Sequence, residues 1–342
     1  MDNYRFDGIQ ALRFLAAIMV VFTHSIFYAS ERLGQGEFSW GTGAKGVDIF
    51  FVISGFVMVI SSRALITDTN GWKIFLNKRL VRIVPLYWAA TTFKLIVILL
   101  ASSLVLHAQI DWWVILKSYF FIPSHNIDGE IKPFLGVGWT LVFEMFFYLT
   151  FSLSMLLGKN VYFFVGSVLL TFSTLSIFRG VNYSEWWFLM DPIILEFYFG
   201  MILGYLILKN KVMPKTPSIM VLILSLAYLF LSSNALNLPR ILESGIPSAM
   251  LVWSVISLEV YFQGKVPQPI MFFGAASYAL YLFHPLVAPL SPVLLNKLAI
   301  GTVPISVLIS VAIAMAVAAV IHRWFEIPVT KHLSKLARKN AF

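Results

Sequence analysis

The stretch ALRFLAAIMVVFTH, residues 11–24, decides the class of fold, because it is an apolar run that carries an arginine, Arg13, and a histidine, His24. With its neighbours it makes a run over residues 9–28, long enough for an α-helix that crosses about 30 Å of hydrocarbon. Ionisable side chains inside such a helix are costly and by default mark a pathway or a reaction site. The segment therefore predicts a membrane span in which two side chains have a function.

The remainder of the chain repeats the apolar pattern. Of its 342 residues 59% are hydrophobic and only 12% are charged, whereas a soluble domain has about 25% charged residues. About ten runs have spanning length, at residues 9–28, 47–62, 83–106, 135–157, 161–178, 189–208, 218–232, 246–262, 270–295 and 303–323. We expect an all-α, polytopic membrane protein in which residues 1–342 form a single membrane domain, with no appended soluble domain.

The distribution of basic residues predicts the orientation. With the amino terminus placed in the cytoplasm, 16 Lys and Arg residues outside the apolar runs fall on the cytoplasmic side and 7 on the other. Cytoplasmic loops are enriched in Lys and Arg, so both termini are predicted to be cytoplasmic. This bias accounts for the net charge of +9. The basic tail KHLSKLARKN, residues 331–340, would also attract anionic lipid, and we expect membrane lipids but no nucleic acid as partners.

Two classes of site are disfavoured by the sequence. The chain has no cysteine, which excludes thiolate catalysis and cysteine-ligated metals. The stretch GTGAKG, residues 41–46, fits the glycine pattern of dinucleotide-binding loops but no strand precedes it. It is predicted to be a turn that leads into the second span.

Helical spacing places Arg13 and His24 on one face. Eleven residues at about 100° each make three turns plus roughly 20°, with a rise of about 16 Å. Arg13 would lie near the cytoplasmic mouth and His24 deeper. Taken singly, Arg13 could instead extend to the interface, and His24 could be a hydrogen-bonded interhelical histidine.

A second basic cluster lies in FLNKRLVRIVPLYW, residues 75–88. Arg79 and Arg82 are three residues apart and project from the same side of a helix, with Lys78 beside them. Guanidinium groups bind phosphate through two hydrogen bonds, so this pair with Arg13 could hold a multiply phosphorylated ligand. The alternative is that these residues only enforce orientation.

Further polar side chains occur inside the apolar runs. Glu144 lies in GWTLVFEMFFY, residues 138–148, between Trp139 and Tyr148, and a lone carboxylate in a membrane needs a partner or a proton. Tyr281 and His284 share a helix face in SYALYLFHPLV, residues 277–287. Asp48, at the head of the second span, could cap that helix or orient a histidine, and both alternatives stay open.

A pair near the carboxyl terminus is expected to be structural. In RWFEIP, residues 323–328, Arg323 and Glu326 are three residues apart. We expect an ion pair or a cap there.

Five segments of the sequence, in their order along the chain, resemble the acyltransferase-three family of integral membrane acyltransferases. Within that family they resemble the bacterial exopolysaccharide acetyltransferase branch. They are RFDGIQALRFLAAIMVVFTHSIFY, GVDIFFVISGFVM, NKRLVRIVPLYW, GWTLVFEMFFY and SYALYLFHPLV. The family pattern is an arginine, ten residues and a histidine in the first span, followed by R-x-x-R. Arg13 to His24 and Arg79 to Arg82 satisfy both parts.

The resemblance implies transfer of an acyl group, usually acetyl, from acyl-coenzyme A to a carbohydrate hydroxyl, in a multi-pass protein of the bacterial inner membrane. The acceptor would be an exported polysaccharide or its lipid-linked precursor, and acetyl-coenzyme A would be the co-substrate, with no metal. His24 would be a general base or a transient acyl carrier, and Glu144 would orient it. Coenzyme A would bind Arg13, Arg79, Arg82 and Lys78, and the acceptor would meet Asp48, Trp139, Tyr281 and His284.

The main alternative is a transporter or flippase for a glycan or an anionic solute, because charged residues in spans also mark transport pathways. A non-catalytic membrane scaffold is a further alternative. The sequence contains no internal repeat that would favour transport, and it does not indicate an oligomeric state.

Overall fold

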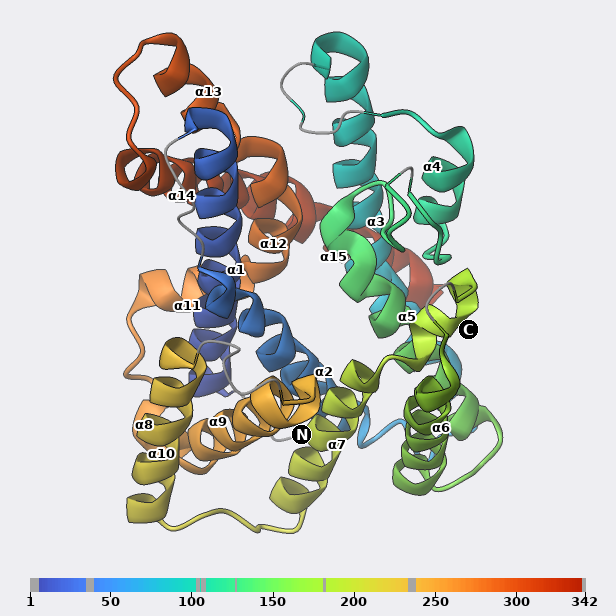
Figure 1. Cartoon of the computed structure of the whole chain (residues 1–342). Helices are drawn as coiled ribbons and strands as arrows, with labels where there is room; N and C mark the ends of the chain where they lie inside the picture. The colour runs from blue at the N-terminus through green and yellow to red at the C-terminus, as the bar shows by residue number, and fades with distance from the viewer. Residues whose placement is uncertain are drawn as a thin grey trace. The chain divides into compact units, whose positions relative to one another are not determined.

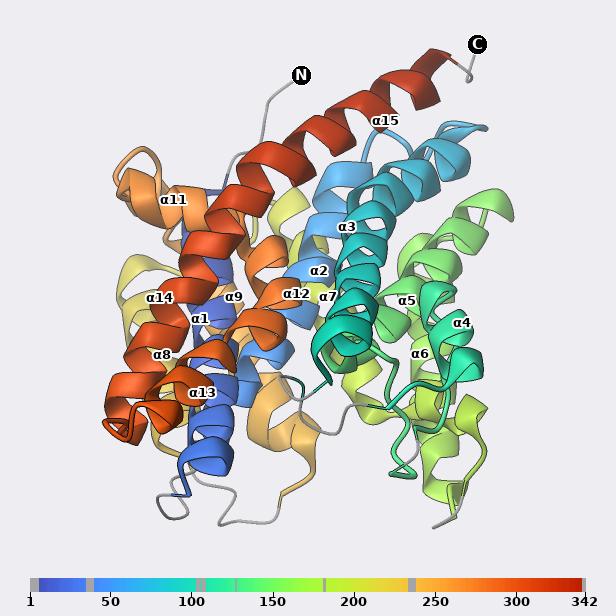
Figure 2. The same cartoon turned by 90° about the horizontal axis from the view of Figure 1, so that it is seen from above.

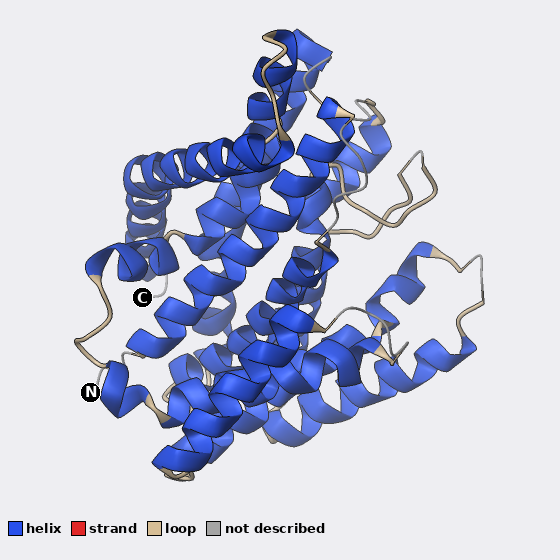
Figure 3. Cartoon of the chain, turned by 60° about the vertical axis from the view of Figure 1, so that its left-hand side comes forward, coloured by secondary structure: helices blue, strands red, loops and turns tan. Residues whose placement is uncertain are grey.

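The computed structural model describes residues 6–34, 40–102, 105, 109–126, 128–180, 183–232 and 238–339. Within these ranges the protein is helical (Figure 3), and the single β-type pairing is an isolated bridge between His125 and Ile131. The all-α prediction is thereby confirmed. Asn340 of the basic tail and residues 103–104 and 106, at the end of the third predicted span, lie outside the described ranges.

Seven helical segments in the described ranges are long and apolar enough to cross a membrane. They contain α1 (Asp7–Leu33), α2 (Gly46–Ser62), α3 (Gly71–Ala101), α5 (Trp139–Leu156), α6 (Val161–Leu175), α12 (Ser277–Val287) with α13 (Leu290–Lys297), and α14 (Val303–Ile321) with α15 (Ile327–Lys339). A 3-10 turn lengthens the segments of α2, α5 and α6 to Gly41–Ser62, Gly136–Leu156 and Val161–Phe178. Three shorter apolar helices occupy the other predicted spans, namely α7 (Leu195–Leu208), α8 (Lys215–Leu231) and α9 (Ile246–Ser257). The protein is therefore a multi-pass membrane protein.

The chain forms two compact units, each assembled from separate stretches. Figure 1 labels the helices and colours them by residue number. Unit 1 comprises Met1–Ala16, Ala44–Leu76 and Phe143–Ala275, and unit 2 comprises Ala17–Gly43, Asn77–Val142 and Ala276–Phe342. Three of the five boundaries fall within α1, α3 and α5, and the other two lie just before α2 and between Ala275 and Ala276.

Unit 1 is organised around close packing of α2 against α7. A β-carbon added to Gly55 would lie 1.9 Å from the carbonyl oxygen of Phe197, and one added to Gly200 would lie 2.0 Å from that of Val52. Glycine lets transmembrane backbones approach to this degree. Around the contact, the Phe197 ring packs on Phe51 and Phe147 at centroid distances of 4.6 Å.

Unit 2 contains the carboxyl-terminal helices. The hydroxyl of Ser310 on α14 donates to the carbonyl of Ala288, just after α12, at 2.7 Å. A π-helical turn, His322–Glu326, joins α14 to α15, and Figure 2 shows the three as one long rod. The predicted pairing of Arg323 with Glu326 is wrong: His322 Nδ1 lies 2.6 Å from Glu326 Oε2, because the wider π-turn brings residues four apart together.

Three boundaries differ from the predicted ones. The third helix begins at Gly71 rather than near residue 83, because Lys and Arg are good helix formers although they end an apolar run. The connection 107–134 contains a short helix, α4 (Trp112–Tyr119), whose first turn is capped by the Asp111 side chain. The run 270–295 is divided among α11 (Gln268–Ala275), α12 and α13.

Candidate functional site

Helix α1 holds Arg13 and His24 as predicted from their spacing. It runs without interruption from Asp7 to Leu33, so the two residues share one face. Arg13 is half-buried and its Nη1 donates to Gln10 Oε1 at 3.3 Å. By contact, Arg13 belongs to unit 1 and His24 to unit 2.

His24 forms a pair with His284 of α12, 260 residues away in the chain. His284 Nε2 lies 3.0 Å from His24 Nδ1, and the ring centroids are 4.9 Å apart. His284 is completely buried, whereas His24 is partly exposed. Each Nδ1 also lies 3.1 Å from a backbone carbonyl one turn earlier, that of Val20 for His24 and that of Leu280 for His284.

These contacts assign the protons of a neutral pair. A carbonyl oxygen only accepts, so each Nδ1 carries its hydrogen. The Nε2 of His284 then has a lone pair, and the one hydrogen on Nδ1 of His24 is shared between this lone pair and the carbonyl of Val20. The hydrogen-bond pattern thus leaves Nε2 of His24 as the atom with a lone pair, and no hydrogen bond to it is recorded among the described residues.

His24 lines a cavity of about 420 Å³ in unit 2. The walls are mostly apolar, with Lys94, Lys132 and Trp139 among the polar or aromatic contributors. The volume lies within the range of small-molecule sites, about 300–1,000 Å³. The other lining side chains come from α1, from α3, from the residues just before α5, and from the end of α12 and the start of α13. They include Phe27, Tyr28, Phe93, Val97, Leu135, Val137, Pro285, Leu286 and Leu290. The predicted acceptor residue Trp139 is therefore placed beside His24.

The basic cluster lies on α3, with Arg79 buried, Arg82 half-buried and Lys78 exposed. The three side chains are thus in one helical segment, as the sequence predicts. Arg79 and Arg82 belong to unit 2. Their predicted combination with Arg13 stays a prediction.

Glu144 lies in unit 1 and accepts hydrogen bonds from two hydroxyl groups. Ser54 Oγ on α2 donates to Glu144 Oε1 at 3.1 Å, and the phenol of Tyr148 donates to the same oxygen through a short hydrogen bond. Tyr148 was the neighbour that the sequence placed one turn away. The prediction that Glu144 orients His24 stays a prediction.

Asp48 is buried in unit 1 and forms an ion pair with Arg240. Arg240 Nε and Nη2 donate to its two carboxylate oxygens at 2.9 and 3.0 Å. Glu196 on α7 is fully buried nearby and interacts electrostatically with Asp48 and with Arg240. The sequence left Asp48 without this partner, because Arg240 is 192 residues distant. Its predicted acceptor-binding role stays a prediction.

The hydroxyl of Tyr281 is occupied by protein groups. It donates to the carbonyl of Val137 at 3.0 Å and lies 3.0 Å from the hydroxyl of Thr140. This arrangement fastens α12 to the start of α5. Contact of Tyr281 with an acceptor stays a prediction.

Lys94 and Lys132 are site residues that the sequence analysis did not single out. Lys94 lies within an apolar run. An ionisable residue in such a run indicates a functional residue, so the sequence alone could have identified Lys94. Its Nζ donates to the carbonyl of Phe134 and lies 4.8 Å from the centroid of that ring. Lys132 lies in a polar connection, where a lysine carries no such signal.

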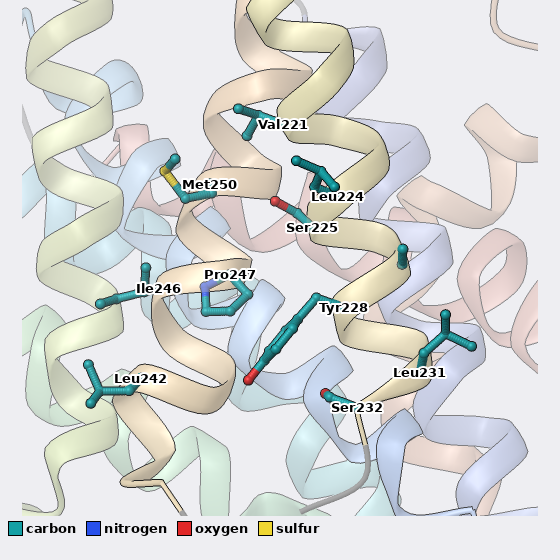
Figure 4. Close-up of a pocket in the computed structure, with 11 residues that line it drawn as sticks. Val221, Leu224, Ser225, Tyr228, Leu231, Ser232, Leu242, Ile246, Pro247 and Met250 are labelled. Atoms are coloured by element: carbon teal, nitrogen blue, oxygen red, sulfur yellow. The ribbon is translucent and has the colours of Figure 1, made fainter. Parts of the chain in front are cut away.

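A second cavity, of about 850 Å³, lies in unit 1 between α8 and α9 (Figure 4). Its walls are apolar side chains with three hydroxyl groups, those of Ser225, Tyr228 and Ser232. It contains no histidine, lysine, arginine or carboxylate among the residues that line it, so we do not assign acyl transfer to it. Across the described ranges no group of three or more His, Asp or Glu side chains is arranged to hold a metal ion.

Comparison with known proteins connects this geometry to a family. A model of the acyltransferase domain family matches residues 6–323. The chain is 38% identical to the exopolysaccharide production protein ExoZ of Rhizobium meliloti over 267 residues, which are 76% of this chain and 80% of that protein. It is 23% identical to the peptidoglycan O-acetyltransferase OatA of Listeria monocytogenes over 84% of this chain and 50% of that protein.

A third relative is the acyltransferase MdmB of Streptomyces mycarofaciens, 27% identical over 44% of this chain and 39% of that protein. No solved structure matches. The family model covers almost the whole chain, including the segment with Arg13 and His24 and that with Arg79 and Arg82. The chain therefore belongs to the acyltransferase-three family of multi-pass membrane acyltransferases.

Proposed function

We propose that this acyltransferase moves an acetyl group from acetyl-coenzyme A to a hydroxyl of an exported polysaccharide or its lipid-linked precursor. The observation that carries the proposal is the His24–His284 pair beside a cavity, in which Nε2 of His24 keeps a lone pair. A basic or nucleophilic nitrogen inside the membrane is what acyl transfer to a hydroxyl needs. The glycan class is supported by two relatives, of which one is an exopolysaccharide production protein and the other a peptidoglycan O-acetyltransferase.

The donor is held by the basic residues. Coenzyme A carries several phosphate charges, and Arg79, Arg82 and Lys78 of α3 supply guanidinium and ammonium groups within one helical segment. Arg13, on the same face of α1 as His24, completes this set. The pantetheine arm then carries the thioester along that face toward His24.

Two chemical routes use His24 Nε2. As a general base, it takes the proton of the acceptor hydroxyl while the oxygen attacks the thioester carbonyl; the C–S bond breaks and the proton goes to the leaving thiolate. As a nucleophile, it bonds to the acyl carbon while the C–S bond breaks and the thiolate leaves. The acceptor hydroxyl then attacks the acyl-imidazole, the C–N bond breaks, and the hydroxyl proton passes to the thiolate. In both routes Nε2 of His284 accepts a hydrogen bond from the Nδ1–H of His24. Glu144 is proposed to stabilise the charged imidazole.

The acceptor reaches His24 from the side opposite the donor. Trp139 lines the cavity with His24, and we assign it, with Asp48 and Tyr281, to the acceptor side of the reaction. His284 acts on the acceptor only through the imidazole of His24. We place both termini in the cytoplasm and the protein in the bacterial inner membrane, as the distribution of basic residues indicates.

The test is an assay of the purified protein with acetyl-coenzyme A labelled in the acetyl group. The acceptor is the polysaccharide isolated from cells that lack the protein. We expect label in the polysaccharide and an equal amount of free coenzyme A. Movement of a glycan across vesicles without any transfer of label would instead support the transporter alternative.

A further inference from the structure

A polar cleft of about 590 Å³ opens next to the His24 cavity in unit 2. Its walls come from α1, from α3, from the residues just before α4 and the start of α4, and from the connection that follows α4. The polar side chains that line it are Lys94, Gln109, Asp111, Asn126, Asp128, Glu130 and Lys132, and Phe27 and Phe134 provide aromatic surface. The side chains of this cleft are thus mostly polar, whereas those of the second cavity, between α8 and α9, are mostly apolar.

The cleft and the His24 cavity share part of their walls. Phe27, Lys94, Lys132 and Gly136 line both. A ligand that fills the cleft therefore lies directly beside the space that His24 lines.

The polar groups of the cleft suit a ligand with many hydroxyls. A hydroxyl both donates and accepts, so its complement is a mixture of carboxylates, ammonium groups and amides. Asp111 uses Oδ1 to cap α4, accepting from Trp113 and Val114. Asn126 uses Oδ1 to accept from the backbone N–H of Glu130 at 2.8 Å, which leaves its amide hydrogens for a ligand.

The charge of the cleft disfavours the donor. Three carboxylates outnumber two ammonium groups, and one of these, Lys132, is paired with Glu130 at 2.9 Å. A polyphosphate such as coenzyme A would meet net repulsion there. A neutral saccharide would not, and its apolar faces could pack on Phe27 and Phe134.

We infer that this cleft binds the carbohydrate acceptor as an uncharged, hydroxyl-rich saccharide and delivers one hydroxyl past Lys94 to Nε2 of His24. This inference rests on the proposed function and names the acceptor site within it. It assigns recognition to the segment 109–134, which the sequence marks only as a hydrophilic connection.

The first test separates acceptor from donor binding. Asn126→Asp keeps the hydrogen bond to Glu130 but removes the amide donors, and Asp128→Ala removes a carboxylate from the rim. Each should raise the acceptor KM about fivefold, the usual effect of one lost hydrogen bond, and leave the acetyl-coenzyme A KM unchanged. Asp68→Ala, an exposed acid in unit 1 that lines neither cavity, is the matched control.

Unchanged acceptor KM in both variants, or an equal rise in the donor KM, would overturn the inference. A second measurement avoids catalysis altogether. The single cysteine of Asp128→Cys, combined with His24→Ala, is labelled with a maleimide in the presence of the polysaccharide or of coenzyme A. We expect the polysaccharide alone to slow labelling severalfold; protection by coenzyme A alone would overturn the inference.

The two proposals fail in different ways. A wild-type protein that transfers no acetyl group contradicts the proposed function itself. An active wild type with unaffected cleft variants contradicts only the acceptor site.

Discussion

His284 orients the imidazole of His24 through a hydrogen bond. Its buried Nε2 accepts the Nδ1–H of His24 and so keeps the lone pair of His24 on Nε2. The sequence suggested His284 as an acceptor contact, and the structure places it against the imidazole instead. We regard it as a positioning residue.

Replacement of His284 by Ala should lower kcat by at least about tenfold, less than the hundredfold or more expected for loss of the base itself. The KM values for both substrates should stay the same, because only the orientation of His24 is affected. His284→Gln, whose side-chain oxygen can accept the same hydrogen, should recover part of the rate. A change confined to KM, or to the unfolding temperature, would contradict the positioning role.

Single residues show where reasoning from the sequence succeeds and where it stops. Arg13 and His24 lie on one helix, so their shared face follows from a local spacing. The pairs His24–His284 and Asp48–Arg240 join residues 260 and 192 positions apart. Such pairs depend on tertiary packing, which no local periodicity encodes.

At the scale of elements, the contact between α2 and α7 depends on glycine. Gly200 has no room for a β-carbon, so Gly200→Ala should force the helices apart and lower the free energy of unfolding by about 1–3 kcal/mol. Gly180→Ala is the matched control, because open space surrounds that position and its backbone is not left-handed. Thermal unfolding in detergent measures both. Equal midpoints for the two variants would show that the close packing is not needed.

The amino-terminal end of α1 is held by Glu259, which begins the short helix α10 (Glu259–Phe262). Its carboxylate accepts from the backbone N–H groups of Asp7 and Gly8. Burial raises the pKa of Glu259 to about 7, although these two hydrogen bonds oppose the rise. The folded state therefore binds a proton that the unfolded state releases near its ordinary pKa of 4.5.

A raised pKa stabilises the fold at low pH. The contribution of Glu259 is complete below its unfolded pKa and is lost as the pH rises through about 7. Unfolding midpoints should therefore fall between about pH 5 and about pH 8, and Glu259→Gln should reduce that fall. The same slope in wild type and variant would contradict the assignment.

The elements themselves were predicted with differing success. Long apolar runs located the helices, because span length and hydropathy follow directly from the bilayer. The start of α3 at Gly71 was missed because Lys and Arg interrupt the apolar run without interrupting the helix. The short α4 was missed since a helix of eight residues leaves little periodicity.

For the whole molecule, orientation in the membrane decides which side each substrate uses. The basic-residue bias predicts that Asp68, between α2 and α3, faces the cytoplasm and that Asp128 faces the opposite side. The natural absence of cysteine makes a direct test possible. In intact cells, a membrane-impermeant maleimide should label Asp128→Cys but not Asp68→Cys; the reverse pattern would invert the orientation.

The rate of acetyl transfer by His24→Ala tests the central claim most directly. The purified variant is compared with wild type at saturating acetyl-coenzyme A and polysaccharide, and unfolding midpoints show that both are folded. Because the variant lacks the nitrogen that would take the proton or the acyl group, its rate should fall at least about a hundredfold. A folded His24→Ala protein that keeps more than about a tenth of the wild-type rate would contradict the claim that His24 is the reacting group.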